Sequence, residues 1–113
     1  MTIVGTCTAS KNYRLSRHLV QDRQARLSVA NNIGFGQIAD SFLIENDNRD
    51  RTIHIVTDTG LVLIETAKTH VIKTILIARG RQIKKYYEAT GKKVPGRIVH
   101  LAYKHEQAGY NEV

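Results

Sequence analysis

Three side chains in the 113-residue chain could do chemistry on a phosphodiester: His18, His70 and Thr74. Cleavage of RNA without a metal ion requires a base for the 2′-hydroxyl, an acid for the 5′-oxygen and positive charge for the transition state. A histidine can supply the acid or the base, since a free imidazole titrates near neutral pH. A threonine hydroxyl can hydrogen-bond a phosphate oxygen. His18 and Thr74 can act together only if they converge on one cleft, and His70 is a second candidate beside it.

Each candidate also has a structural explanation. His18 lies in a mostly polar segment, which suits a residue on the surface of a helix. Thr74 lies in a β-branched run, where threonine favours a strand by propensity and packing alone. Tyr86 and Tyr87 could stack on bases, but the spacing of Ile83 and these tyrosines predicts that they pack against a sheet.

No metal or cofactor site is predicted. Cys7 is the only cysteine, so neither an intrachain disulfide nor a zinc pattern is possible. His100 and His105 are five residues apart, which does not place them on one helix face. The chain also lacks a glycine-rich loop of the kind that holds nucleotide phosphates.

The net charge of +7 is unevenly distributed along the chain. Residues 1–66 hold seven basic and seven acidic side chains, whereas residues 67–113 hold ten basic and three acidic ones. Residues 11–26 form a second basic segment, with five positive groups against Asp22 alone. We expect the first helix and segment 79–97 to lie side by side, so that their cations form one continuous patch. Such a patch favours a phosphate backbone as ligand, and the alternative is a solvated surface that only aids solubility.

The basic side chains expected to contact nucleic acid come from both segments. They are Lys11, Arg14, Arg17, Lys73, Arg79, Arg81, Lys84, Lys85 and Arg97.

Three strands are predicted between residues 52 and 78. TIHIVT (52–57) and LVLIET (61–66) form a β-hairpin around the turn DTG. HVIKTILIA (70–78) follows after too short a connection for a crossover, so it pairs antiparallel with the second strand. Strict alternation puts Ile72 and Ile75 on opposite faces, and Lys73 is expected to point to an edge or a cleft.

Helices are predicted on both sides of these strands. Ser16 is the expected N-cap of a first helix, and Ser28 is expected to cap a weaker second helix that runs through residue 43. A helix over 81–89 ends at Gly91, and another begins at Pro95. The first residues of the chain could add a strand.

These elements predict an α+β fold. One or two N-terminal helices pack on a three- to four-stranded antiparallel sheet, which two short C-terminal helices follow. The length fits a single domain over residues 1–113. The absence of a secretory signal and of a long apolar stretch predicts a cytoplasmic protein without a membrane partner.

The segments LSRHLVQDRQARLS, IHIVTDTGLVLIE and VIKTILIARGRQIKKYY occur in this order. In this arrangement they resemble a group of small metal-independent ribonuclease folds that includes colicin D, the RelE-type toxins and barnase-like prophage domains. The tail YYEATGKKVPGRIVHLAYKHEQAGYN is similar to small prophage and mobile-element proteins of Gram-positive bacteria. The resemblance implies that His18, Thr74 and Arg79 face RNA in a positive cleft. The glutamate base of the group has no counterpart unless Glu65 reaches the cleft.

Two functions follow from these observations. The first is an accessory protein of a prophage or mobile element that binds RNA or DNA through a basic face. The alternative is a toxin-like, metal-independent endoribonuclease that uses His18 and Thr74. The first needs only the charge pattern, whereas the second needs converging geometry. An acidic protein partner or antitoxin fits either function, and the oligomeric state is left open.

Overall fold

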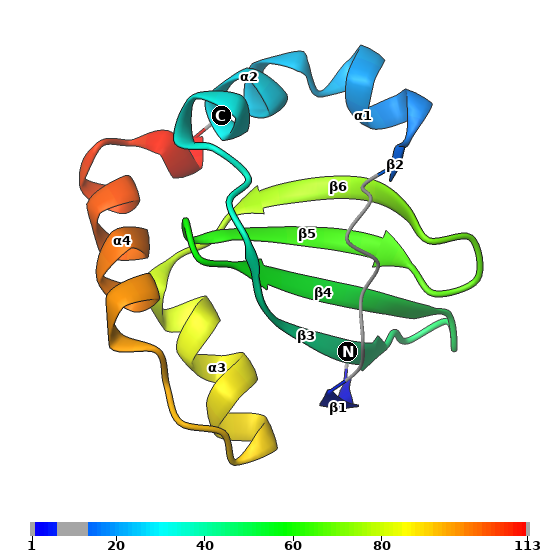
Figure 1. Cartoon of the computed structure of the whole chain (residues 1–113). Helices are drawn as coiled ribbons and strands as arrows, with labels where there is room; N and C mark the ends of the chain where they lie inside the picture. The colour runs from blue at the N-terminus through cyan, green and yellow to red at the C-terminus, as the bar shows by residue number, and fades with distance from the viewer. Residues whose placement is uncertain (1, 7–13, 113) are drawn as a thin grey trace.

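One mixed β-sheet forms the centre of the computed structural model, which describes residues 2–6 and 14–112 (Figure 1). Within these residues the strand order is β1-β3-β4-β5-β6-β2. Neighbouring strands are antiparallel except for β2, which is parallel to β6. The strands are β1 (Thr2–Thr6), β2 (Arg14–Leu15), β3 (Ile38–Glu45), β4 (Arg51–Thr57), β5 (Leu61–Thr66) and β6 (Val71–Ile77).

Helices cover both faces of the sheet. They are α1 (Arg17–Asp22), α2 (Gln24–Ile33), α3 (Gly80–Thr90), α4 (Gly96–Gln107) and the short 3₁₀ helix η1 (Tyr110–Glu112). On one face, Phe42 and Val56 pack with residues of α3 and α4 such as Tyr87. On the other face, the strands pack against Leu19 of α1 and Ala30 of α2. We call these the α3/α4 face and the α1/α2 face.

The α+β class is correct, but the expected antiparallel sheet of three to four strands beneath N-terminal helices is wrong. Six strands are present in the described ranges, and β2 makes the sheet mixed. The second helix is α2, which ends before Gly34 (φ 91°), and residues 38–45 form β3 instead. Side chains of β3 are buried on both faces, so its apolar run has the same appearance as a buried helix.

A β-bulge at Lys73 changes the faces of β6. Ile64 pairs with Thr74, whereas the next residue of β5, Glu65, pairs with Ile72. Lys73 is therefore the extra residue, and Ile72 and Ile75 lie on the same α1/α2 face. The strict alternation expected for this strand is wrong for that reason.

Local signals place the helix ends. Ser16 caps α1 as predicted, because its Oγ accepts a hydrogen bond from the Leu19 amide at 3.1 Å. The chain after α3 turns at Gly91, whose φ of 69° is the left-handed conformation predicted for this cap. Ser28 is not a cap, since it lies inside α2.

In the described ranges no helix is both long and apolar enough to span a bilayer.

Candidate nucleic-acid interface

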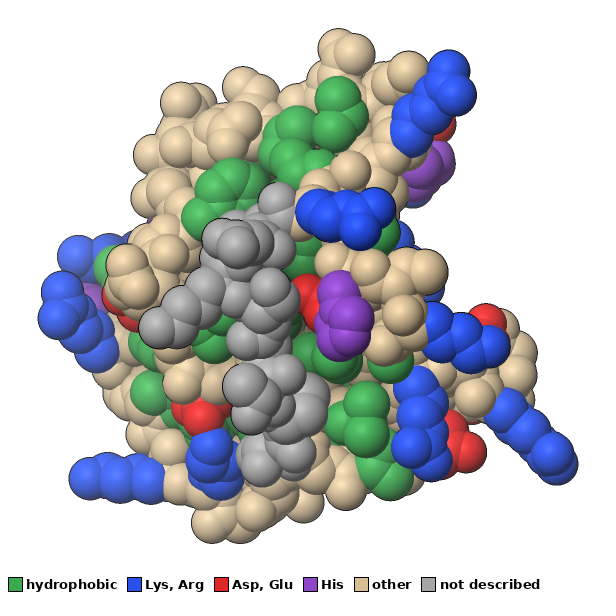
Figure 2. Space-filling model, turned by 45° about the vertical axis from the view of Figure 1, so that its right-hand side comes forward, with side chains coloured by type: hydrophobic (Ala, Val, Ile, Leu, Met, Phe, Trp, Pro, Cys, Tyr) green, Lys and Arg blue, Asp and Glu red, His purple; other side chains and the backbone are tan. Residues whose placement is uncertain are grey.

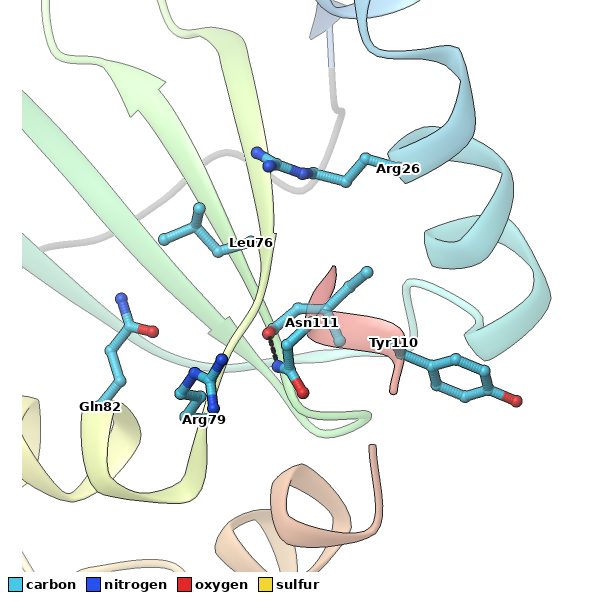
Figure 3. A pocket seen from close by; sticks show the side chains of 7 residues that line it. Arg26, Leu76, Arg79, Gln82, Tyr110 and Asn111 are labelled. Atoms are coloured by element: carbon cyan, nitrogen blue, oxygen red, sulfur yellow. Dashed lines mark hydrogen bonds between the residues drawn. The ribbon is translucent and has the colours of Figure 1, made fainter. Parts of the chain in front are cut away.

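The outer edge of β6 is the part of the sheet where the two basic segments meet. Strand β2 pairs only with Val71 and Ile72, so the following residues of β6 have no strand beside them in the described chain. At the far end of β6, the Asn111 side-chain amide of η1 donates to the Ile77 carbonyl. A pocket of about 160 Å³ lies at this edge. It is lined by Arg26, Leu76, Ile77, Arg79, Gln82, Tyr110 and Asn111 (Figure 3).

This pocket has one arginine from each basic segment. Arg26 extends from α2 on one face of the sheet, and Arg79 stands at the start of α3 on the other (Figure 3). Among the residues that the structure describes, no Asp or Glu side chain lines the pocket. Next to Arg79, the Gly80 amide donates a hydrogen bond to Oε1 of Glu106 at 3.0 Å. The two basic segments therefore meet at the edge of β6 and not between two adjacent helices.

The first helix and segment 79–97 do not lie side by side. Helix α1 packs on the α1/α2 face through Leu19, while α3 packs on the opposite face. Figure 2 shows Lys and Arg side chains in several separate groups on the face in view, with apolar side chains between them. The expected single patch is therefore replaced by groups of cations around the sheet.

Most of the predicted nucleic-acid contacts are exposed and lack a carboxylate partner. In the described part of the chain, no ion pair involves the exposed residues Arg14, Arg17, Lys73, Arg79, Arg81, Lys85 and Arg97. Lys84 is different because its Nζ lies over the Tyr103 ring, 5.5 Å from the centroid. Lys11 lies outside the described residues.

The structure does not bring His18 and Thr74 to one cleft. Thr74 pairs with Ile64, whose side chain packs on the α3/α4 face, whereas α1 lies on the other face. His18 Nδ1 is 2.8 Å from Asp22 Oδ2, and both side chains are more than half exposed. His18 thus has a local partner on its own helix.

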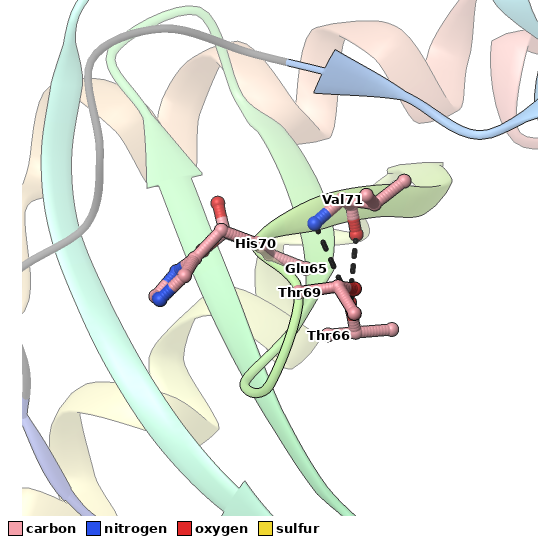
Figure 4. A network of polar contacts seen from close by, with 5 residues as sticks. All are labelled: Glu65, Thr66, Thr69, His70 and Val71. Carbon is pink, nitrogen blue, oxygen red and sulfur yellow. Dashed lines mark hydrogen bonds and ion pairs between the residues drawn. The ribbon is translucent and has the colours of Figure 1, made fainter.

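His70 instead pairs with Glu65, which lies on the α1/α2 face. Glu65 is 1% exposed, and its Oε1 lies 2.6 Å from Nδ1 of His70. The other oxygen of Glu65 has no hydrogen-bond partner among residues 2–6 and 14–112. The His70 side chain is 55% exposed and stands at the end of a turn in which Thr66 and Thr69 are hydrogen-bonded (Figure 4). A buried carboxylate therefore holds one nitrogen of an exposed imidazole.

The contact between Glu65 and His70 was not predicted from the sequence, because it depends on backbone geometry. His70 has a φ of 55°, a left-handed conformation that turns its ring back toward β5. A strand pattern that includes His70 predicts an extended residue instead. Arg14 stands close by, since it pairs in register with Val71.

A second histidine is buried on the α3/α4 face. His54 is 4% exposed, and its Nδ1 lies 2.6 Å from the hydroxyl of Tyr86. Burial, together with the positive charge of Lys73, lowers the pKa of His54 to about 4. Burial raises the pKa of Tyr86 to about 12. His54 is therefore a neutral core residue, and both tyrosines pack against the sheet as predicted.

Comparison of the chain with family models, curated protein sequences and solved structures found no match. The resemblance to ribonuclease-like folds and to mobile-element proteins stays a prediction. In the described residues, no group of three or more His, Cys, Asp and Glu side chains could hold a metal ion.

Proposed function

We propose that the chain binds the phosphate backbone of a nucleic acid along the outer edge of β6, as an accessory protein of a mobile element. The observation that carries the proposal is the pocket shared by Arg26 and Arg79. Arginine suits this ligand because its planar guanidinium can donate two hydrogen bonds to one phosphate.

Further cations flank this edge. Arg14 lies on β2, which pairs with the first residues of β6, and Arg17 begins α1 directly after it. The seven residues of β6 extend over roughly 23 Å at about 3.3 Å per residue. That length suits several consecutive nucleotides.

A binding assay tests the proposal. A fluorescently labelled single-stranded oligonucleotide, as RNA and as DNA, is titrated with the protein and followed by anisotropy. The double variant Arg26→Gln/Arg79→Gln should weaken binding at least about tenfold, equivalent to about 1.4 kcal/mol. The control Lys93→Gln/Lys104→Gln removes the same charge from exposed residues that do not line this pocket. Equal weakening by both double variants would show that binding depends on the overall charge of the protein, and it would contradict a binding site at the β6 edge.

The pair of Glu65 and His70 supports a second candidate function, metal-independent RNA cleavage. With Nδ1 held by Glu65, the Nε2 atom of His70 is left to exchange protons with a substrate. A carboxylate in this position fixes the tautomer of the imidazole and the orientation of its ring. Arg14 on the adjacent strand would offset charge on the phosphate.

A cleavage assay in excess chelator separates the enzyme from the binding protein. If His70 is the base, His70→Gln should lower the rate about 10²- to 10⁴-fold, while His18→Ala leaves it unchanged. Binding of the oligonucleotide without any cleavage by the wild-type protein would leave only the accessory role.

A further inference from the structure

A second cationic pocket lies at the end of the sheet that carries the β3–β4 and β5–β6 turns. Its volume is about 470 Å³, and residues of both turns line it. Strand pairing creates the pocket, since Thr52 at the start of β4 pairs with Thr66 at the end of β5. Four basic side chains converge there: Arg49, Arg51, Lys68 and Lys73.

The charge of this pocket is strongly unbalanced. Among the described lining residues Asp50 is the one carboxylate, and its Oδ2 accepts a hydrogen bond from Asn48 at 2.9 Å. Arg51 stands 3.9 Å from Glu45, at the limit of an ion pair. In the part of the chain that the structure describes, Arg49, Lys68 and Lys73 belong to no ion pair. The four basic side chains and Asp50 give the described lining residues a net charge of +3.

Hydroxyl groups accompany the cations. Thr52 is 3% exposed, and its Oγ lies 3.2 Å from both Nδ2 of Asn46 and Nε2 of His54. In the tautomer of His54 that carries its proton on Nε2, this nitrogen donates to Thr52 and the Tyr86 hydroxyl donates to Nδ1. Thr52 then accepts two hydrogen bonds, and its own proton can be donated to a ligand.

Left-handed residues shape the two turns at this end of the sheet. Among the described residues, Arg49 and His70 are the two non-glycine residues with positive φ, at 67° and 55°. One lies in each of the two turns that meet at this end of the sheet. Hydrogen bonds hold both conformations, from the Arg49 amide to Asn46 and from the His70 amide to Thr66. Arg49 itself lines the pocket, and the turn that ends at His70 carries Lys68.

We propose that this pocket binds a phosphate monoester dianion. Three net positive charges and a buried hydroxyl suit the charge and the acceptor oxygens of that group. The site differs from the β6 edge, because neither Arg26 nor Arg79 lines it. It takes a terminal phosphate, whereas the β6 edge takes the phosphodiester backbone.

Calorimetric titration with inorganic phosphate and with adenosine monophosphate, at constant ionic strength, tests the site. The variant Arg49→Gln/Lys68→Gln should weaken phosphate binding at least about tenfold, equivalent to about 1.4 kcal/mol. Lys93→Gln/Lys104→Gln, with the same charge, should bind as the wild type does. Absence of phosphate binding by the wild-type protein, or equal loss in both variants, would overturn the proposal.

Two further arms identify the source of the phosphate and separate this site from the proposed function. A 5′-phosphorylated oligonucleotide that binds more tightly than its 5′-hydroxyl form identifies a nucleic-acid end as the source. Tight binding of adenosine monophosphate without that difference identifies a small phosphate ester. Arg26→Gln/Arg79→Gln should keep full phosphate binding even where it loses the oligonucleotide, so each site can fail alone.

Discussion

The Nδ1 atom of His54 lies 2.6 Å from the hydroxyl of Tyr86, which joins β4 to α3 inside the core. Both residues are less than 5% exposed, and Tyr86 stacks on Phe42 at 5.3 Å between ring centroids. The imidazole is neutral in the folded protein because burial lowers its pKa to about 4. Protonation of His54 must therefore oppose folding.

The first prediction is a loss of stability in mild acid. An unfolded histidine takes up its proton near pH 6.5, whereas folded His54 does so only near pH 4. The contribution of neutral His54 to the free energy of unfolding is complete above pH 6.5. It falls as the pH drops from 6.5 to 4, and the loss is about 2 kcal/mol at pH 5. Urea unfolding at pH 7 and pH 5 measures the loss. His54→Gln should lose about 2 kcal/mol less than the wild type over this interval, and an equal loss would show that His54 is not its source.

The second prediction concerns the contact between α3 and α4 at Gly80. A Cβ at position 80 would lie 2.7–2.9 Å from three ring carbons of Tyr103, so the ring would have to move. Tyr103 is 39% exposed and can swing outward, which limits the cost of Gly80→Ala to about 1 kcal/mol. Unfolding of the single and double variants checks this account. Gly80→Ala should cost less in a Tyr103→Ala background, and additive effects would exclude the steric conflict.

The third prediction is that the Glu65 carboxylate costs stability. One of its oxygens is buried without a hydrogen-bond partner, and the other contacts an exposed histidine. Replacement of an incompletely paired buried charge by an apolar side chain of similar volume is often neutral or stabilising. The free energy of unfolding of Glu65→Met, measured by urea titration, should therefore equal that of the wild type or exceed it by up to about 1 kcal/mol.

The matched variant His70→Gln removes the imidazole and keeps the carboxylate buried. It should be less stable than Glu65→Met, because it leaves Glu65 without its partner. A large loss of stability in Glu65→Met would instead give this carboxylate a structural role. Retention of a costly group would be expected at a functional site.

Local sequence signals predicted the elements whose determinants lie within a few residues. Ser16 and Gly91 place helix ends by their own side chain or backbone, and the DTG turn sets the hairpin of β4 and β5. The strands β2 and β3 depend on pairing between segments far apart in the chain, which periodicity does not show, whereas β1 is the strand expected at the first residues. The bulge at Lys73 likewise depends on its partner strand.

The residue types of the candidate interface could be predicted from the sequence, but their positions relative to one another could not. The two basic segments are visible in the sequence, yet their meeting point at Arg26 and Arg79 follows from helices on opposite faces of one strand. The contact between Glu65 and His70 required a left-handed residue that nothing in a strand pattern indicates. The second pocket had a usable signal, because the hairpin register brings residue 51 and residue 67 to the same end of the sheet.

The salt dependence of oligonucleotide binding tests the account of the β6 edge most directly. For a single strand, the slope of log affinity against log salt falls by about 0.7 for each phosphate contact that is lost. Arg26→Gln/Arg79→Gln should therefore reduce the slope by about 1.4, and Lys93→Gln/Lys104→Gln should leave it as in the wild type. A slope that is unchanged in the first variant, or reduced equally in both, would contradict a phosphate-binding edge at β6.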